Sequence, residues 1–160
     1  MDARVLSVNA AYLGITPKGS KFIKLLCELD DTRELYQTLF LTEKTRDNSL
    51  KSLVKYGFKG TISEIGEMED GKNAASLFNV PESGIEVIVE NREYTDKASG
   101  EEKSVTQIEC IKGFGFKKAG VDKKDIPKFR EDDFELKRIQ ADKLPLGNDW
   151  TEPSTEDLPI

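Results

Sequence analysis

The chain has 160 residues, a formal net charge of −6, no histidine and two cysteines. That length suits one domain, which is large enough to bury a hydrophobic core. Without histidine the chain cannot build a Ser–His or Cys–His nucleophile or a histidine-ligated metal site, and two cysteines are too few for a structural zinc site. We therefore expect a protein that binds without catalysing and that needs no cofactor or metal.

The cysteines and the apolar runs bear on the cellular compartment. Cys27 and Cys110 lie in apolar, strand-like runs far apart in the sequence, which favours buried reduced thiols over a disulfide. The sequence has no apolar run of about 18 residues, and its start, MDARVLSV, lacks the pattern of a signal peptide. We expect a cytoplasmic protein of a bacterial host that has no membrane partner.

The negative charge is unevenly distributed along the chain. Residues 1–59 carry ten Lys or Arg against seven Asp or Glu, and residues 91–121 carry six against five. Residues 60–90 carry one lysine against seven acids, and residues 147–160 carry four acids and no base. The segments predicted below to form strands are thus net positive, so the overall charge does not exclude a nucleic-acid partner.

The first 42 residues predict three strands joined by short turns. The strands are expected at 5–15, 21–29 and 34–42, because apolar residues alternate there and turn residues separate them. In the second strand, Ile23, Leu25, Cys27 and Leu29 alternate with Phe22, Lys24, Leu26 and Glu28. In the third, Leu35, Leu39 and Leu41 face one side, and Tyr36, Thr38 and Phe40 face the other.

A helical insertion follows these strands. Asn48 or Ser49 can cap a helix that carries Leu50, Leu53 and Val54 and ends near Tyr56-Gly57. A second short helical turn is expected to start at Thr61, with Ile62 and Ile65 facing inward, and an acidic loop is expected at 67–72.

Two further strands complete the pattern. They are expected at 85–94 and 103–111, joined by a polar hairpin loop that contains Gly100. Five short strands with a helix between the third and fourth predict a mainly β protein, a five-stranded Greek-key barrel of the OB type. An open half-sandwich with the same elements is the alternative.

The chain is expected to divide into three parts. Residues 1–118 would form the OB-fold nucleic-acid-binding domain. Residues 119–146 would form a charged C-terminal arm, either an amphipathic helix or an extended segment laid on the barrel, with isolated apolar residues at Phe129, Phe134, Leu136 and Ile139. Residues 147–160 have no periodicity and two prolines and are expected to be a disordered acidic tail.

Aromatic and basic residues share the faces of the second and third strands that lack most of the leucines. Proteins that bind single strands combine cations for the phosphates with aromatic rings on which bases stack. If the leucines point inward, alternation directs Phe22, Lys24, Tyr36, Thr38 and Phe40 outward. With the neighbouring turns and the second hairpin, the candidate nucleic-acid-binding residues are Tyr12, Lys18, Lys21, Phe22, Lys24, Tyr36, Phe40, Arg92, Tyr94, Lys97 and Lys112.

The C-terminal residues read WTEPSTEDLPI. They resemble the C-terminal peptide of bacterial and bacteriophage single-stranded-DNA-binding proteins, in which acids precede a proline and a terminal hydrophobic residue. That family usually ends in Phe, whereas this chain ends in Ile160. The resemblance implies that replication or recombination proteins bind the tail, at Glu156, Asp157, Leu158, Pro159 and Ile160.

Residues 10–112 also resemble bacteriophage single-stranded-DNA-binding proteins. The resemblance rests on the Lys18-Gly19 turn, the segment LFLT at 39–42, the helix end Tyr56-Gly57-Phe58 and the hairpin around NREY at 91–94. It implies an OB fold, sequence-independent binding of single-stranded DNA in phage replication or recombination, and no catalysis.

Two alternatives compete with this hypothesis. An inhibitor or adaptor that mimics DNA would use the acidic block 60–90 and the tail to bind a basic partner. A metal-dependent nuclease would use Glu67, Glu69 and Asp70, but these acids lie in a Gly-containing loop that is typical of solvated side chains. The oligomeric state is left open by the sequence.

Overall fold

Five antiparallel strands form one sheet in the computed structural model, which describes residues 2–68, 70–95, 99–113, 121 and 123–135. The strands are β1 (Asp2–Ile15), β2 (Lys21–Leu29), β3 (Glu34–Phe40), β4 (Ile85–Thr95) and β5 (Glu102–Ile111). They lie in the order β3-β2-β1-β4-β5, with the long β1 in the centre. The protein is mainly β, as the sequence predicted.

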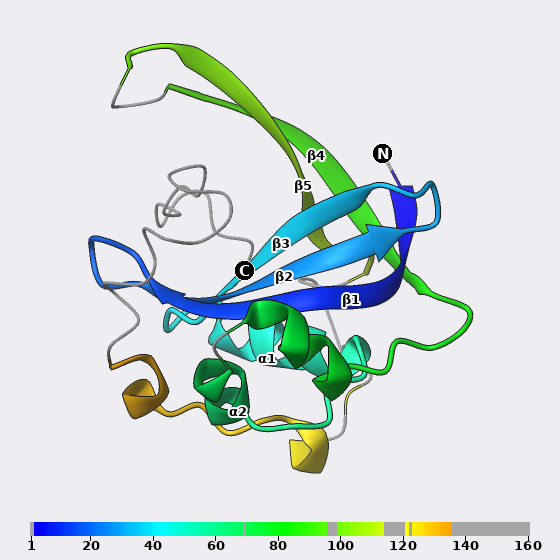
Figure 1. Cartoon of the computed structure of the whole chain (residues 1–160), viewed down its shortest axis with the longest axis vertical. Coiled ribbons are helices and arrows are strands. Elements are labelled where there is room, and N and C mark those ends of the chain that lie inside the picture. Colours follow the sequence, from blue (N-terminus) through cyan, green and yellow to red (C-terminus); the bar gives the residue numbers. More distant parts are fainter. Residues whose placement is uncertain (1, 69, 96–98, 114–120, 122, 136–160) are drawn as a thin grey trace.

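β1 joins the two parts of the sheet. It pairs with β2 from Val5 to Ile15, and with β4 only from Asp2 to Val5. The β1–β2 register shifts between Val5 and Ser7 and again between Val8 and Ala10, and such irregularities bend a strand. The sheet curves so far that β3 and β5, at its two edges, contact each other. Figure 1 shows the β4–β5 hairpin rising over the β1–β3 part of the sheet.

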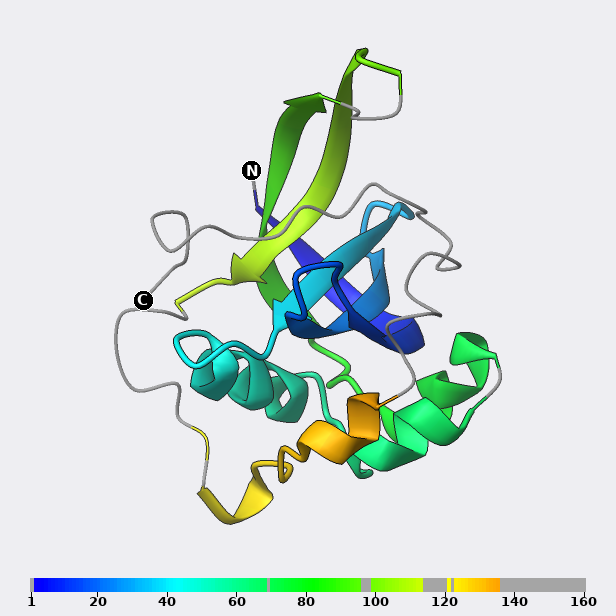
Figure 2. The same ribbon diagram turned by 90° about the vertical axis from the view of Figure 1, so that its left-hand side faces the viewer.

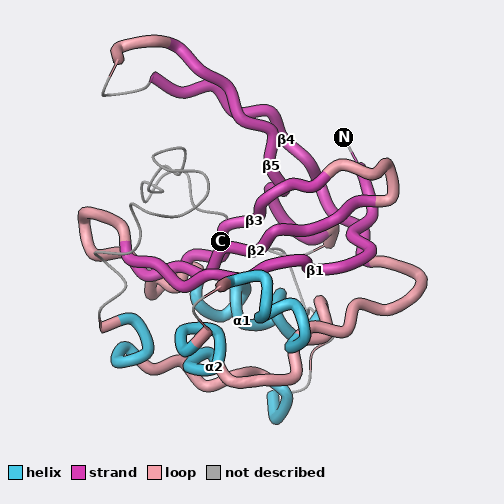
Figure 3. Tube along the Cα trace, viewed as in Figure 1, coloured by secondary structure: helices cyan, strands magenta, loops and turns pink. Residues whose placement is uncertain are grey.

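The helical segments lie on the other side of the β1–β3 part (Figure 3). They are α1 (Arg46–Lys55), α2 (Ile62–Glu67) and the 3₁₀ segment η1 (Gly71–Leu77). The predicted start of α2 is confirmed, because the Thr61 hydroxyl accepts from the Glu64 amide while the Glu64 carboxylate accepts from the Thr61 amide.

The predicted cap of α1 was wrong. Thr45, rather than Asn48 or Ser49, occupies the N-cap position, and its side chain makes no hydrogen bond to the helix amides. The Ser49 hydroxyl donates to the carbonyl oxygen of Phe40, so it is not used to accept from the first turn of a helix. Sequence alone cannot show this bond, because it depends on the path of the chain between β3 and α1.

One hydrophobic core lies between the strands and the helices. The leucine-rich faces of β2 and β3 supply buried residues such as Ile23, Leu25 and Leu39, and α1 supplies Leu50 and Leu53. The buried hydroxyl of Tyr56 donates to Oε1 of Gln37, so that these polar groups satisfy each other inside the core. Cys27 is a buried free thiol and Cys110 a partly buried one.

The described part of the C-terminal arm packs on this core. It is an extended segment with two 3₁₀ turns, η2 (Lys123–Asp125) and η3 (Glu131–Phe134), rather than the alternative amphipathic helix. Phe134 is fully buried in the core cluster, and Ile126 and Phe129 pack against that cluster. Figure 2 shows the arm, in yellow and orange, running beneath the helices. Leu136, Ile139 and the tail 147–160 lie outside the described residues.

Candidate nucleic-acid interface

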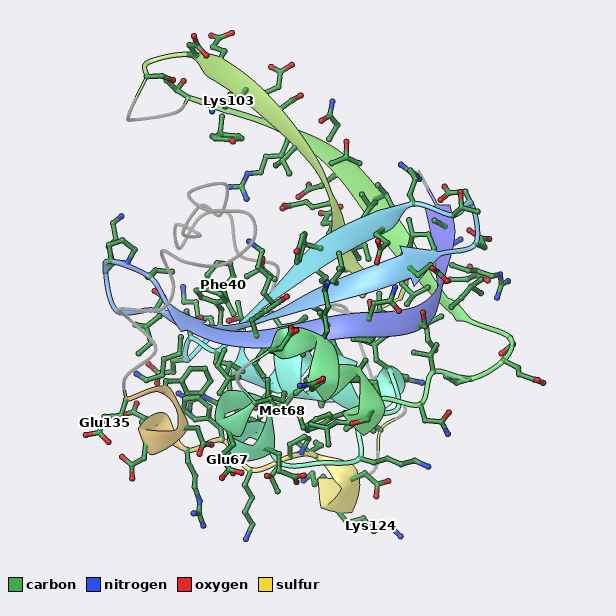
Figure 4. The ribbon with its side chains drawn as sticks, in the orientation of Figure 1. Phe40, Glu67, Met68, Lys103, Lys124 and Glu135 are labelled. Carbon is green, nitrogen blue, oxygen red and sulfur yellow. The ribbon has the colours of Figure 1, made fainter. Side chains whose placement is uncertain are left out.

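One face of β1, β2 and β3 lies opposite the face that carries Ile23, Leu25 and Leu39, and it holds most of the predicted aromatic residues, with η1 adjoining it at Tyr12. We call it the aromatic face and define it by Tyr12, Gly14, Phe22, Lys24, Tyr36, Thr38 and Phe40. Register places these residues in cross-strand rows, one of Gly14, Phe22 and Phe40 and the next of Tyr12, Lys24 and Thr38. In Figure 4, Phe40 points away from the helices, into the space beneath the β4–β5 hairpin.

The first row is tightly packed. The Phe22 ring lies over Gly14 so closely that a Cβ added to Gly14 would be 2.2 Å from Cζ of Phe22. Phe22 and Phe40 meet edge to face with their ring centroids 6.0 Å apart. Phe22 is therefore completely buried, whereas Phe40 is partly exposed. Alternation predicted the correct side of the sheet for Phe22, but its expected exposure was wrong.

Lys24 of the second row lies beside Tyr36, which is opposite Leu26 in the following row. Nζ of Lys24 lies 5.4 Å from the ring centroid of Tyr36, within the range of a cation–π interaction. Lys24 is only 1% exposed, so its expected exposure was also wrong. Alternation alone would have left this cation in solvent, whereas in the structure it is buried beside the Tyr36 ring.

The two tyrosines of this face have raised pKa values. Burial, followed by the nearby Asp70, raises the pKa of Tyr12, whose ring packs on Gly71 at the start of η1. Burial, followed by Tyr12 and Glu34, raises the pKa of Tyr36. Both rings are partly exposed and keep their phenolic protons at neutral pH, as neutral stacking surfaces require.

The two ends of the aromatic face differ in their contacts. At one end Glu28 and Glu34 are cross-strand partners, and Asn9 donates to Glu34 with an Nδ2–Oε2 distance of 2.9 Å. At the other end the carbonyl oxygen of Phe40 accepts from Thr45 Oγ1 at 2.8 Å and from Ser49 Oγ at 2.5 Å. The Phe40 end is thus hydrogen-bonded to the start of α1, whereas the opposite end carries the carboxylates of Glu28 and Glu34.

The β4–β5 hairpin carries two more candidate residues. Arg92 and Tyr94 are partly buried and share one face of the ribbon, whereas the alternating Asn91, Glu93 and Thr95 are exposed. Lys103 lies directly across the hairpin from Tyr94. Sequence analysis missed Lys103, because only the register reveals which residue of β5 faces Tyr94. Lys97 lies outside the described residues.

Three predicted lysines lie outside the residues that define the aromatic face. Lys18 is exposed in the turn between β1 and β2, just beyond the row of Gly14 and Phe22. Lys21 belongs to the core-facing side of β2 by alternation, and its ammonium is 4.0 Å from the Glu131 carboxylate of the arm. Lys112 pairs with Asp2 at 2.9 Å and with Glu86 at 3.6 Å, beside the opposite end of β1 from Gly14. The ammonium groups of Lys21 and Lys112 thus face carboxylates rather than Phe22 and Phe40.

The acidic loop offers no metal-binding cluster among its described residues. The Asp70 carboxylate accepts from the Lys72 amide at 3.0 Å and caps η1, and Glu67 is exposed. Within the described ranges no group of three or more Cys, Asp or Glu side chains could hold a metal ion. The same part of the chain contains no helix long and apolar enough to cross a membrane.

The tail residues Glu156, Asp157, Leu158, Pro159 and Ile160 lie outside the described residues. Comparison with known proteins adds no assignment for the tail or the domain. No protein-family model matches this chain, and no curated protein matches it.

Proposed function

We propose that this protein binds single-stranded DNA without sequence preference, as an OB-type barrel. The strand order, the contact between β3 and β5, and the position of α1 between β3 and β4 suit such a barrel. In this proposal the aromatic face and the Arg92–Tyr94 face of the hairpin hold one DNA strand between them.

The observation that carries the proposal is the composition of the aromatic face. A sheet face turned away from the core holds Phe40, Tyr36 and Tyr12 as partly exposed rings, with Phe22 supporting Phe40 from beneath. Such rings stack on any base, because every base has a π-face. Arg92 and Lys103 on the hairpin supply positive charge near the path of the phosphates.

The rest of the proposal extends the resemblance drawn from the sequence. The protein acts in phage replication or recombination in the cytoplasm of a bacterial host, and its acidic tail binds other replication proteins. It has no catalytic role.

A titration with labelled oligothymidylate at several salt concentrations tests this function. Binding should weaken steeply with salt, with a slope of about −0.7 in log K per neutralised phosphate. A duplex of the same length and a single strand of mixed sequence are the controls. Affinity should be similar for both single strands and much lower for the duplex. No binding of single strands, or tighter binding of the duplex, would overturn the proposal.

A further inference from the structure

A second basic surface lies on the helical side of the molecule. Residues 44–59 carry five Lys or Arg against one Asp, and residues 123–130 carry four against one Asp. The structure brings these distant segments together, because the Arg46 guanidinium of α1 lies 4.3 Å from the ring centroid of Phe129 in the arm. We call this the helix–arm surface and define it by Lys44, Lys51, Lys55, Lys59, Lys123, Lys124, Lys128 and Arg130.

The charges of the helix–arm surface face solvent. All of its defining residues are at least partly exposed, and Figure 4 places Lys124 on the opposite side of the sheet from Phe40. Lys128 and Arg130 are exposed on either side of Phe129, which packs inward. Within the described part of the chain, Lys44, Lys51 and Lys55 form no ion pair. The surface therefore concentrates positive charge in a protein whose net charge is −6.

This surface begins where the aromatic face ends. Phe40 is bonded through its carbonyl oxygen to Thr45 and Ser49, so that the first turn of α1 directly adjoins the Phe40 end. Lys51 and Lys55 follow on one side of the helix, about 6 Å apart along its axis. At the other end of the face, Glu28 and Glu34 repel phosphates. At the Phe40 end the exposed Glu43 and Asp47 offset Lys44 and Arg46, so that the excess of positive charge along α1 begins at Lys51 and Lys55.

We propose that the helix–arm surface binds the phosphate backbone of a single DNA strand that continues past Phe40. This inference rests on the proposed function and assigns a second, purely electrostatic segment to the same binding path. A short oligonucleotide occupies the aromatic face alone, whereas a longer one also reaches α1 and the arm. The acidic residues Glu131, Asp132 and Asp133 of η3 border the surface and limit it on that side.

The test compares two oligothymidylates, about 8 and about 35 nucleotides long, chosen around the site size of one OB fold. The full-length variant Lys51→Gln/Lys55→Gln removes two charges from the helix–arm surface. Lys72→Gln removes one charge from an exposed lysine outside this surface and is the control. Circular dichroism melts confirm that each variant is folded.

We expect the test variant to bind the short strand like the wild type. For the long strand, its slope of log K against log salt should shrink by about 1.4, two contacts at about 0.7 each, with an unchanged slope for the control. An unchanged slope for the test variant, or equal losses with both strands, would overturn the inference. Failure of the wild type to bind even the short strand would instead refute the proposed function, and this inference with it. A labelled peptide of residues 148–160 provides a further comparison. If the wild type binds it, the test variant does not, and binding of the long strand is unchanged, the surface binds an acidic peptide and the inference is overturned.

Discussion

Gly14 lies directly across the β1–β2 ladder from Phe22, and the Phe22 ring fills the space that a side chain at residue 14 would need. Because the ring is buried and rests against Phe40, it cannot move aside freely. Gly14→Ala should therefore lower the free energy of unfolding by about 1–3 kcal/mol, the usual effect of overpacking. Urea denaturation measures this change.

A double-mutant cycle tests whether the clash with the Phe22 ring causes this loss of stability. In a Phe22→Ala background the added methyl group has room, so that Gly14→Ala should lose most of its effect. Additive effects of the two substitutions would show that Gly14 is required for another reason.

Phe40 should contribute mainly to DNA binding, whereas Phe22 should contribute mainly to stability. Phe40→Ala should weaken the binding of oligothymidylate by about 1–3 kcal/mol, because it removes a partly exposed ring, and Tyr36→Ala should act similarly. Phe22→Ala should chiefly reduce stability, by about 3–5 kcal/mol, because the side chain is buried. Anisotropy titrations and urea denaturation measure the two effects.

Leu6→Ala, at an exposed apolar residue of β1, is the control. Unchanged binding in both Phe40→Ala and Tyr36→Ala would remove these rings from the interface.

The C-terminal arm should be required for a stable domain. Phe134 is 0% exposed and belongs to the core cluster, so that Phe134→Ala should cost about 3–5 kcal/mol of stability. Lys128→Ala, at an exposed residue of the same arm, should change stability by less than about 0.5 kcal/mol. Thermal melts compare the two variants. Equal melting temperatures for Phe134→Ala and the wild type would show that the arm is dispensable.

Alkaline pH should destabilise the protein. Burial raises the pKa of the Cys27 thiol and raises that of Tyr56 well above its ordinary value, whereas the unfolded chain titrates these groups normally, from about pH 8.5 and about pH 10. Above those values the unfolded state binds fewer protons than the folded state, so that the free energy of unfolding falls as pH rises. Urea denaturation between about pH 8 and about pH 11 measures this loss.

The variant Tyr56→Phe separates the contribution of the phenol. It should be less stable at neutral pH by about 1–3 kcal/mol, because Gln37 loses its buried partner. Its stability should then fall less steeply above about pH 10 than that of the wild type. A parallel decline in both proteins would show that Tyr56 does not cause the alkaline destabilisation.

Local sequence patterns predicted the secondary structure better than they predicted which side chains are buried. β2 has its predicted bounds because its alternation is strict and turns flank it, and α2 follows from the Thr61–Glu64 capping box. Alternation also assigned Phe22 and Lys24 to the correct side of the sheet. It could not show that both are buried, because that depends on the register with Gly14 and on the ring of Tyr36.

Contacts between distant segments account for the remaining differences. The burial of Phe134 depends on how the arm folds back over the helices, and no local pattern indicates that path. The same holds for Lys112, whose chemistry suits a phosphate but whose ammonium pairs with Asp2 and Glu86. Residue type therefore identified the lysines that could bind phosphates. The fold was needed to show which of them are already paired with carboxylates.

The short pairing between β1 and β4 has a mechanical consequence. β4 is held by β1 only opposite Asp2 to Val5, and the β4–β5 register shifts just beyond, between Ile88 and Val89. The hairpin is therefore attached to the rest of the sheet by this short ladder on one side and by the contact between β5 and β3 on the other. Beyond these contacts the ribbon from Glu90 to Thr95 pairs with β5 alone, so that the position of Arg92 and Tyr94 is set at the base of the hairpin.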